Sequence, residues 1–188
     1  MIEQVPNFIT TVRIALVVPL CWFLWNGGYV ESLLIVFFAS VSDAVDGALA
    51  RKFDWMSRFG AMADPIADKL LVGVVFIILM IQQHVPLWLG LVVLVRDLII
   101  LTGAAVYRYL FDRIEIAPTF VSKANTAMQF IMLTLVLVGL VEIEPVSEFA
   151  EALVDPACFL IVAVLSITSG VDYVIRWSHR AIVKARHE

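Results

Sequence analysis

Apolar residues dominate the chain in long runs, and each run is close to the length of a helix that crosses a membrane. Six runs are separated by short polar connections, at residues 14–30, 32–50, 61–81, 86–106, 124–141 and 152–175. A helix rises about 1.5 Å per residue, so about 20 apolar residues cross the ~30 Å of hydrocarbon in a bilayer. The pattern predicts six transmembrane helices, of which 86–106 is the least regular because Arg96 and Asp97 interrupt it.

The first residues differ from the apolar runs that follow. The stretch IEQVPNFIT mixes Ile, Val and Phe with polar residues and contains Pro6, which predicts a short N-terminal interfacial segment on the cytoplasmic surface. No basic cluster or clear cleavage site marks a signal peptide, so we expect the first helix to be retained. The connections are short and free of repeats, so the expected fold class is an all-α bundle of six transmembrane helices, with residues 1–188 as one domain.

Composition excludes an ordinary soluble domain. Hydrophobic residues make up 62% of the chain and charged residues only 16%, whereas charged residues approach a quarter of a typical soluble domain. We therefore expect an integral membrane protein with lipids as neighbours and no nucleic-acid partner. Cys21 and Cys158 fall in apolar runs, where small packing residues are favoured over a disulfide or a metal pair.

The basic residues are distributed unequally between the two sides of the predicted bundle. The connections NGGYVE, QQHVP and VEIEPVSEFAE contain no Lys or Arg, so all 13 basic residues lie toward the other side. The positive-inside rule then places both termini in the cytoplasm, and we expect the inner (plasma) membrane as the location. Within the last run, Asp172 and Arg176 are four residues apart and can pair on one helix face.

Four aspartates stand between the second and third apolar runs. Asp43 and Asp46 are three residues apart and Asp64 and Asp68 are four apart, so each pair shares one face of a helix. Both pairs adjoin the same predicted cytoplasmic loop, and turning their faces together would gather four carboxylates. Ionised carboxylates at membrane depth are costly, and hard divalent cations balance them. The spacing predicts a site for two Mg²⁺ or Mn²⁺ ions that face the cytoplasm.

Small residues accompany these carboxylates. Gly47, Ala50 and Gly60 leave room for a ligand close to the backbone, and Arg51 offers a planar donor fork suited to phosphate. A helix cap or a single ion pair would explain one aspartate but not four at these spacings. Metal ions, an arginine and bare backbone together indicate a pyrophosphate site.

At these residues the chain resembles the CDP-alcohol phosphotransferase family. The matching pattern is Asp43-x2-Asp46-Gly47-x2-Ala50-Arg51-x8-Gly60-x3-Asp64-x3-Asp68. The resemblance implies a homodimeric six-helix enzyme that binds CDP-diacylglycerol as donor and an alcohol as acceptor. It also implies that Asp43, Asp46 and Asp64 are metal ligands, and that Gly47, Ala50 and Gly60 line the cleft for cytidine and pyrophosphate. Asp68 would be a further ligand and the general base toward the acceptor hydroxyl.

Two further stretches resemble subgroups of this family. Asn7, Thr10 and Arg13 in NFITTVR are similar to the N-terminal pattern of phosphatidylglycerophosphate and cardiolipin synthases, which implies that Asn7 and Thr10 contact the donor. Capping by the first two and snorkelling of Arg13 explain the same residues. The stretches VRDLIILTGAAVYRY and APTFVSKANTAMQ resemble cardiolipin synthases of the phosphotransferase type.

The acceptor is expected near the fifth run. Lys123 is the cation that we expect on an acceptor phosphate, with Ser122 beside it and Arg113 or Arg108 assisting; contact with lipid head groups is the alternative for these cations. The expected reaction moves a phosphatidyl group from CDP-diacylglycerol to phosphatidylglycerol with release of CMP. Glycerol 3-phosphate, giving phosphatidylglycerophosphate, is the second candidate acceptor. The resemblance to cardiolipin synthases at Asp97 and Ser122 implies the first.

An ion-coupled transporter is the rival from another class, because carboxylates within membrane helices also bind Na⁺, H⁺ or divalent ions. The sequence has no inverted pair of helices broken by Gly or Pro, and its charges gather at one membrane face. A non-catalytic membrane scaffold would leave the four aspartates without a role.

Overall fold

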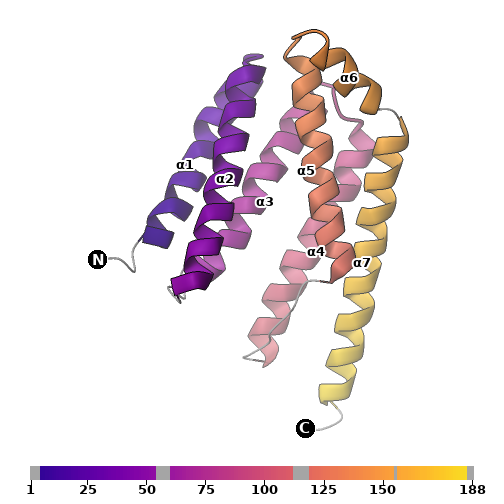
Figure 1. Cartoon of the computed structure of the whole chain (residues 1–188). Helices are drawn as coiled ribbons and strands as arrows, with labels where there is room; N and C mark the ends of the chain where they lie inside the picture. Colours follow the sequence, from indigo (N-terminus) through magenta and orange to yellow (C-terminus); the bar gives the residue numbers. More distant parts are fainter. Residues whose placement is uncertain (1–4, 54–59, 112–118, 155, 186–188) are drawn as a thin grey trace. The chain divides into compact units, whose positions relative to one another are not determined.

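The described part of the chain consists of α-helices joined by short turns. The computed structural model describes residues 5–53, 60–111, 119–154 and 156–185 (Figure 1), and of residues 5–10, 43–53, 60–68, 104, 105, 107–111 and 179–185 it describes the backbone alone. The helices are α1 (Val5–Trp25), α2 (Tyr29–Phe53), α3 (Gly60–Ile81), α4 (Leu87–Phe111), α5 (Phe120–Leu140), α6 (Val146–Leu153) and α7 (Pro156–Ala185). Within these ranges there is no strand, and the all-α prediction is confirmed.

Local backbone chemistry ends the first helix. Gly27 takes a φ of 76°, which glycine adopts without a steric cost, and the amide of Gly28 donates to the carbonyl of Phe23 at 2.8 Å. Asn26 Nδ2 also donates to the carbonyl of Trp22 at 2.7 Å. These bonds satisfy the last carbonyls of α1, so the chain can turn into α2 within three residues.

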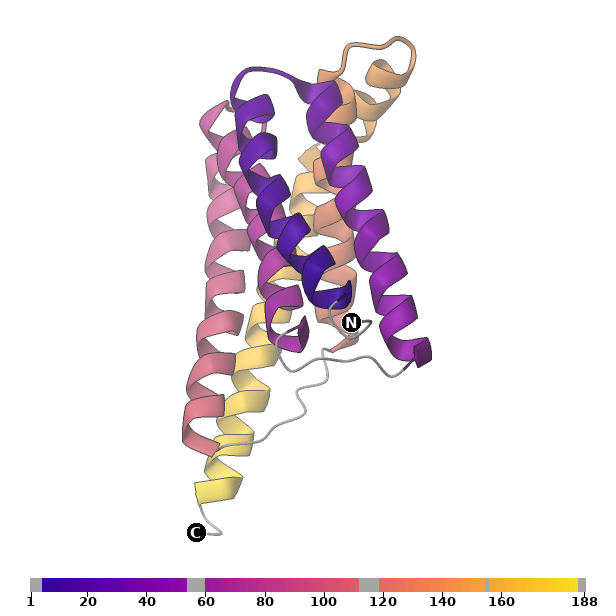
Figure 2. The same cartoon turned by 90° about the vertical axis from the view of Figure 1, so that its left-hand side faces the viewer.

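Contacts divide the chain into two compact units. The first comprises Met1–Val85 and Leu133–Ala152, and within it α1 packs against both α2 and α3 (Figure 2). Leu20, Leu24, Phe76 and Leu79 are fully buried there. Gln82 Nε2 donates to the carbonyl of Leu24 at 2.8 Å, which ties the end of α3 to the end of α1.

The second unit comprises Pro86–Met132 and Leu153–Glu188. Its α4 packs against α7, and the first part of α5 belongs to it. Leu89, Val93 and Val162 are buried in this unit, but so are an arginine and several polar side chains. The prediction of one domain for residues 1–188 stays a prediction.

One expectation about secondary structure is wrong, and one predicted connection contains a helix. The short helix α6 begins within the stretch VEIEPVSEFAE and ends at Leu153; its inward positions Ser147 and Ala150 are buried, while Phe149 is exposed. Eight residues with two buried positions are too few to stand out as an apolar run. At the other end, α1 is continuous from Val5, so residues 5–10 extend the first helix instead of forming a separate interfacial segment.

Two helices of the described residues are long and apolar enough to cross a membrane. They are Phe120–Leu140, which is α5, and Pro156–Ser178 within α7. Thr11–Trp25, Tyr29–Ser42 and Lys69–Ile81 are apolar but shorter. Charged residues shorten the apolar part of α2 and α3, since both aspartate pairs lie inside these helices.

Candidate active site

The four aspartates of the sequence pattern all lie on helices of the first unit. Asp43 and Asp46 belong to the second half of α2, and Asp64 and Asp68 lie in the first turns of α3. Their helical backbone agrees with the expected sharing of one face by each pair. Their side chains lie outside the described residues, so their roles as metal ligands, and that of Asp68 as general base, stay predictions.

The small residues and the arginine of the pattern flank these aspartates. Gly47, Ala50 and Arg51 continue α2 after Asp46, and Gly60 is the first residue of α3. Of these four residues too the structure describes the backbone alone. Among the side chains that it does describe, no group of three or more His, Cys, Asp or Glu could hold a metal.

Helix α1 connects the two helices that carry the aspartates, because it packs against both. Asn7 and Thr10 lie in its first turns, with side chains outside the described set. Arg13 follows one turn later and is only 3% exposed. The Arg13 side chain therefore does not snorkel to the surface. Arg13 therefore adds a positive charge to the interior of the first unit. A buried charge of this kind is stable only among compensating groups.

The second unit contains a buried arginine, Arg96, which the sequence showed as an interruption of an apolar run and as part of the stretch VRDLIILTGAAVYRY, without indicating its partners. Arg96 of α4 is 4% exposed and donates three hydrogen bonds. Its Nη1 donates to Asp97 Oδ1 at 2.6 Å, and its Nη2 donates to Ser122 Oγ of α5 at 2.7 Å and to Ser169 Oγ of α7 at 2.6 Å. The guanidinium thus joins three helices, and Asp97 supplies its counter-charge at the same position.

A second polar layer lies one helix turn away on the same faces of α5 and α7. Ser166 Oγ donates to Asn125 Oδ1 at 2.9 Å, and Gln129 Nε2 donates to Ser166 Oγ at 3.3 Å. All three side chains are at most 1% exposed. The sequence held a signal for this layer, because Ser166 and Ser169 are three apart, and Asn125 and Gln129 four apart, in otherwise apolar runs.

The predicted acceptor residues differ in their exposure to solvent. Ser122 is buried and its hydroxyl accepts the hydrogen bond from Arg96. Lys123 is exposed on the first turn of α5, where an anion can reach its ammonium group. Arg113 lies outside the described residues, as does the side chain of Arg108. Of this set, the structure supports Lys123 as an accessible cation and Ser122 as a neighbour fixed by Arg96.

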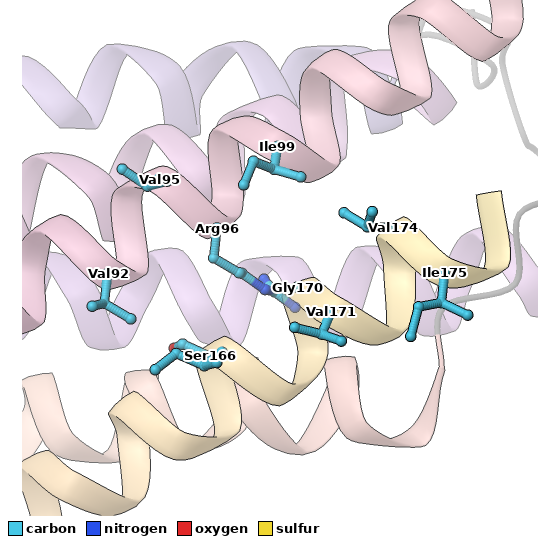
Figure 3. Close-up of a pocket in the computed structure, with 10 residues that line it drawn as sticks. Val92, Val95, Arg96, Ile99, Ser166, Gly170, Val171, Val174 and Ile175 are labelled. Atoms are coloured by element: carbon cyan, nitrogen blue, oxygen red, sulfur yellow. The ribbon is translucent and has the colours of Figure 1, made fainter. Parts of the chain in front are cut away.

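A cavity of about 380 Å³ lies between α4 and α7 (Figure 3). Its apolar walls are formed by Val92, Val95 and Ile99 of α4 and by Val171, Val174 and Ile175 of α7. Arg96 and Ser166 border the same cavity, and Figure 3 shows Arg96 extending from α4 toward Gly170. Apolar walls of this kind do not suit a nucleotide pyrophosphate.

Comparison with known proteins connects this arrangement to one family. The family model described as CDP-alcohol phosphatidyltransferase matches residues 3–177. A cardiolipin synthase (CMP-forming) / mitochondrial hydrolase fusion protein of Schizosaccharomyces pombe is 34% identical over 98% of this chain and 33% of its own length. A CDP-diacylglycerol–glycerol-3-phosphate 3-phosphatidyltransferase of Rickettsia bellii is 34% identical over 73% of this chain and 76% of its own length.

A chloroplastic protein of the latter name from Oryza sativa subsp. japonica is 33% identical over 93% of this chain and 57% of its own length. The chain thus spans 33% of the length of the Schizosaccharomyces pombe relative and larger shares of the lengths of the other two. The chain belongs to the CDP-alcohol phosphatidyltransferase family, because the family model covers both aspartate-bearing helices and the second unit as far as Trp177.

Proposed function

We propose that this protein is a membrane enzyme that transfers a phosphatidyl group from CDP-diacylglycerol to a glycerol-based acceptor and releases CMP. The observation that carries the proposal is the set of four aspartates on α2 and α3, at helical spacing, inside the region matched by the family model. These aspartates offer carboxylate oxygens as metal ligands, and Mg²⁺ and Mn²⁺ prefer oxygen ligands of this kind.

The acceptor that we propose is phosphatidylglycerol, which makes the product cardiolipin. One relative carries cardiolipin synthase in its name and two carry glycerol-3-phosphate, so the names alone do not choose between the two acceptors. The Arg96–Asp97 pair and Ser122 lie in the two stretches, VRDLIILTGAAVYRY and APTFVSKANTAMQ, whose resemblance to cardiolipin synthases supports phosphatidylglycerol. Lys123 follows Ser122 in the sequence, is exposed, and would bind the phosphate of either acceptor.

The chemistry proposed for the site is an in-line substitution at phosphorus. Asp68 takes the proton of the acceptor hydroxyl while the hydroxyl oxygen forms a bond to the phosphorus that carries the diacylglycerol. The bond from that phosphorus to the bridging oxygen breaks, and CMP leaves with the electron pair. Two divalent cations held by Asp43, Asp46, Asp64 and Asp68 would supply charge neutralisation of the pyrophosphate. Gly47, Ala50 and Gly60 leave space for the cytidine end of the donor.

We further propose six membrane spans, both termini in the cytoplasm and a location in the inner (plasma) membrane, with the protein acting as a homodimer. Large apolar side chains are exposed along the helices, including Val18 at 73% and Phe37 and Phe38 at 60% each. Apolar exposure on this scale fits contact with lipid chains. The absence of Lys and Arg from the connections on one side supports the orientation.

A direct test measures CMP release by purified protein from labelled CDP-diacylglycerol, with Mg²⁺ or Mn²⁺ and with each acceptor in turn. We expect release that depends on the metal and on phosphatidylglycerol, with cardiolipin as the product. Release with glycerol 3-phosphate alone would overturn the proposed acceptor and leave the reaction class intact. No metal-dependent release with either acceptor would overturn the enzyme proposal itself.

The same assay separates the roles of the aspartates. Asp68→Asn should bind donor normally but lose turnover by about a hundred-fold or more, since general-base catalysis contributes about 10²–10⁴-fold. Asp43→Asn should instead weaken metal-dependent donor binding, because metal binding is the whole of the role proposed for Asp43, whereas Asp68 also acts as the base. Equal and mild effects of the two substitutions would contradict these assignments.

A further inference from the structure

Arg96 forms hydrogen bonds at the point where α5 begins. Ser122 is in the first turn of α5, and its hydroxyl accepts from Arg96. The backbone amides of this turn are capped by Thr119, because Ser122 N donates to Thr119 Oγ1 at 3.2 Å and Lys123 N donates to the Thr119 carbonyl at 3.0 Å. The turn that carries Lys123 is therefore fixed both along the chain and from α4.

The anchor on the other side is Ser169. This serine of α7 is fully buried and accepts from the same Nη2 atom that donates to Ser122. One nitrogen thus sets the position of α5 against α7. A guanidinium has planar donors at fixed angles, so its hydrogen-bond partners are held in a fixed relative orientation. The freely rotating ammonium of lysine does not impose such an orientation. The 4% exposure of Arg96 keeps water from competing for these bonds.

We propose that Arg96 is a positioning residue for the acceptor site, with Ser169 as its anchor. Through Ser122 it holds the first turn of α5, and so keeps the Lys123 ammonium where an acceptor phosphate binds. The inference rests on the proposed function, since it assumes an acceptor at Lys123. Positioning of this kind acts through binding geometry, because small displacements of a binding group weaken the productive complex.

The chain offers a matched pair of serines for the test. Ser169 and Ser166 are both fully buried on α7, three residues apart. Ser169 accepts from Arg96, whereas Ser166 bonds Asn125 and Gln129 further along α5. Ser169→Ala removes the anchor of Arg96, and Ser166→Ala removes a comparable link between α5 and α7 that does not involve Arg96. Ser169→Thr keeps the hydroxyl and serves as the conservative rescue.

The measurement is CMP release in mixed micelles, with separate titration of acceptor and donor. We expect Ser169→Ala to raise the acceptor KM about ten-fold, which corresponds to about 1.4 kcal/mol, and to leave the donor KM within about two-fold. Ser169→Thr should stay within about three-fold of the wild type in both. Ser166→Ala should change the acceptor KM by less than about three-fold.

Amide exchange supplies a readout that does not depend on catalysis. The amides of Ser122 and Lys123 should exchange faster in Ser169→Ala than in Ser166→Ala, because only the first loosens the start of α5. Equal acceptor KM values for the two alanine variants in an active enzyme would overturn the inference, as would unchanged exchange at these amides. A wild-type protein without CMP release would instead remove the proposed function, and the acceptor role of Arg96 with it.

Discussion

Two arginine–aspartate pairs of the second unit have nearly the same N–O distance and very different exposure to solvent. Arg96 Nη1 lies 2.6 Å from Asp97 Oδ1, with side chains 4% and 15% exposed. Arg176 Nε lies 2.7 Å from Asp172 Oδ1, with side chains 56% and 25% exposed. Burial decides the energetic weight of such a pair, since removing one partner of a buried pair leaves a charge without compensation.

Asp97→Asn should therefore destabilise the protein by about 3 kcal/mol, because Arg96 keeps its charge and loses its counter-charge. Asp172→Asn is the matched control and should cost less than about 1 kcal/mol, as exposed pairs do. Thermal unfolding in detergent micelles measures both. Similar losses for the two variants would contradict the view that the surroundings of Arg96 are poorly solvated.

For individual residues, the sequence predicted some side-chain partners but not others. The pairing of Asp172 with Arg176 was predicted from a spacing of four and is confirmed. Cys21 and Cys158 are free, as expected of packing residues. The partners of Arg96 were not predictable, because Ser122 and Ser169 are 26 and 73 residues away along the chain.

Among the elements, α4 and α7 are in close contact at a glycine. A Cβ atom added at Gly103 would overlap Cζ3 of the Trp177 ring, far inside van der Waals contact. Trp177 also packs edge-on against Tyr173, with ring centroids 5.8 Å apart. The indole therefore fills the space that the missing side chain leaves, and α4 can approach α7 only because residue 103 is glycine.

Gly103→Ala should lower the free energy of unfolding by about 1–3 kcal/mol, because the indole must shift or the helices must separate. Gly170→Ala is the control on α7, since its Cβ would meet Arg96 Cγ at an ordinary 3.5 Å. Thermal unfolding and the tryptophan emission spectrum of the two variants give the comparison. An unchanged melting temperature for Gly103→Ala would show that Trp177 relocates without cost.

Helix positions were predictable where apolar runs are long. The run 61–81 became α3 (Gly60–Ile81) and the run 124–141 became α5 (Phe120–Leu140). Polar helix ends were not predictable from hydropathy, so the run 86–106 falls short of α4, which continues to Phe111. The amphipathic helix α6 was missed for the same reason, since only Ser147 and Ala150 are buried.

For the whole molecule, the proposed orientation is the property most open to a direct test. In a background with Cys21 and Cys158 replaced by alanine, Glu148→Cys should react with a membrane-impermeant maleimide in intact cells, because α6 belongs to the side without basic residues. His187→Cys near the C-terminus should react only after permeabilisation. Labelling of both or of neither in intact cells would contradict the orientation.

The sequence by itself determined the all-α class and the family, because helix length, helix period and the aspartate spacing are local properties of the chain. Only the tertiary structure decided that α1 packs against both aspartate-bearing helices, that Arg13 and Arg96 are buried, and that Arg96 joins α4 to Ser122 and Ser169. These features depend on which helix faces meet. Periodicity within a helix identifies its apolar face but not the helix that packs against it.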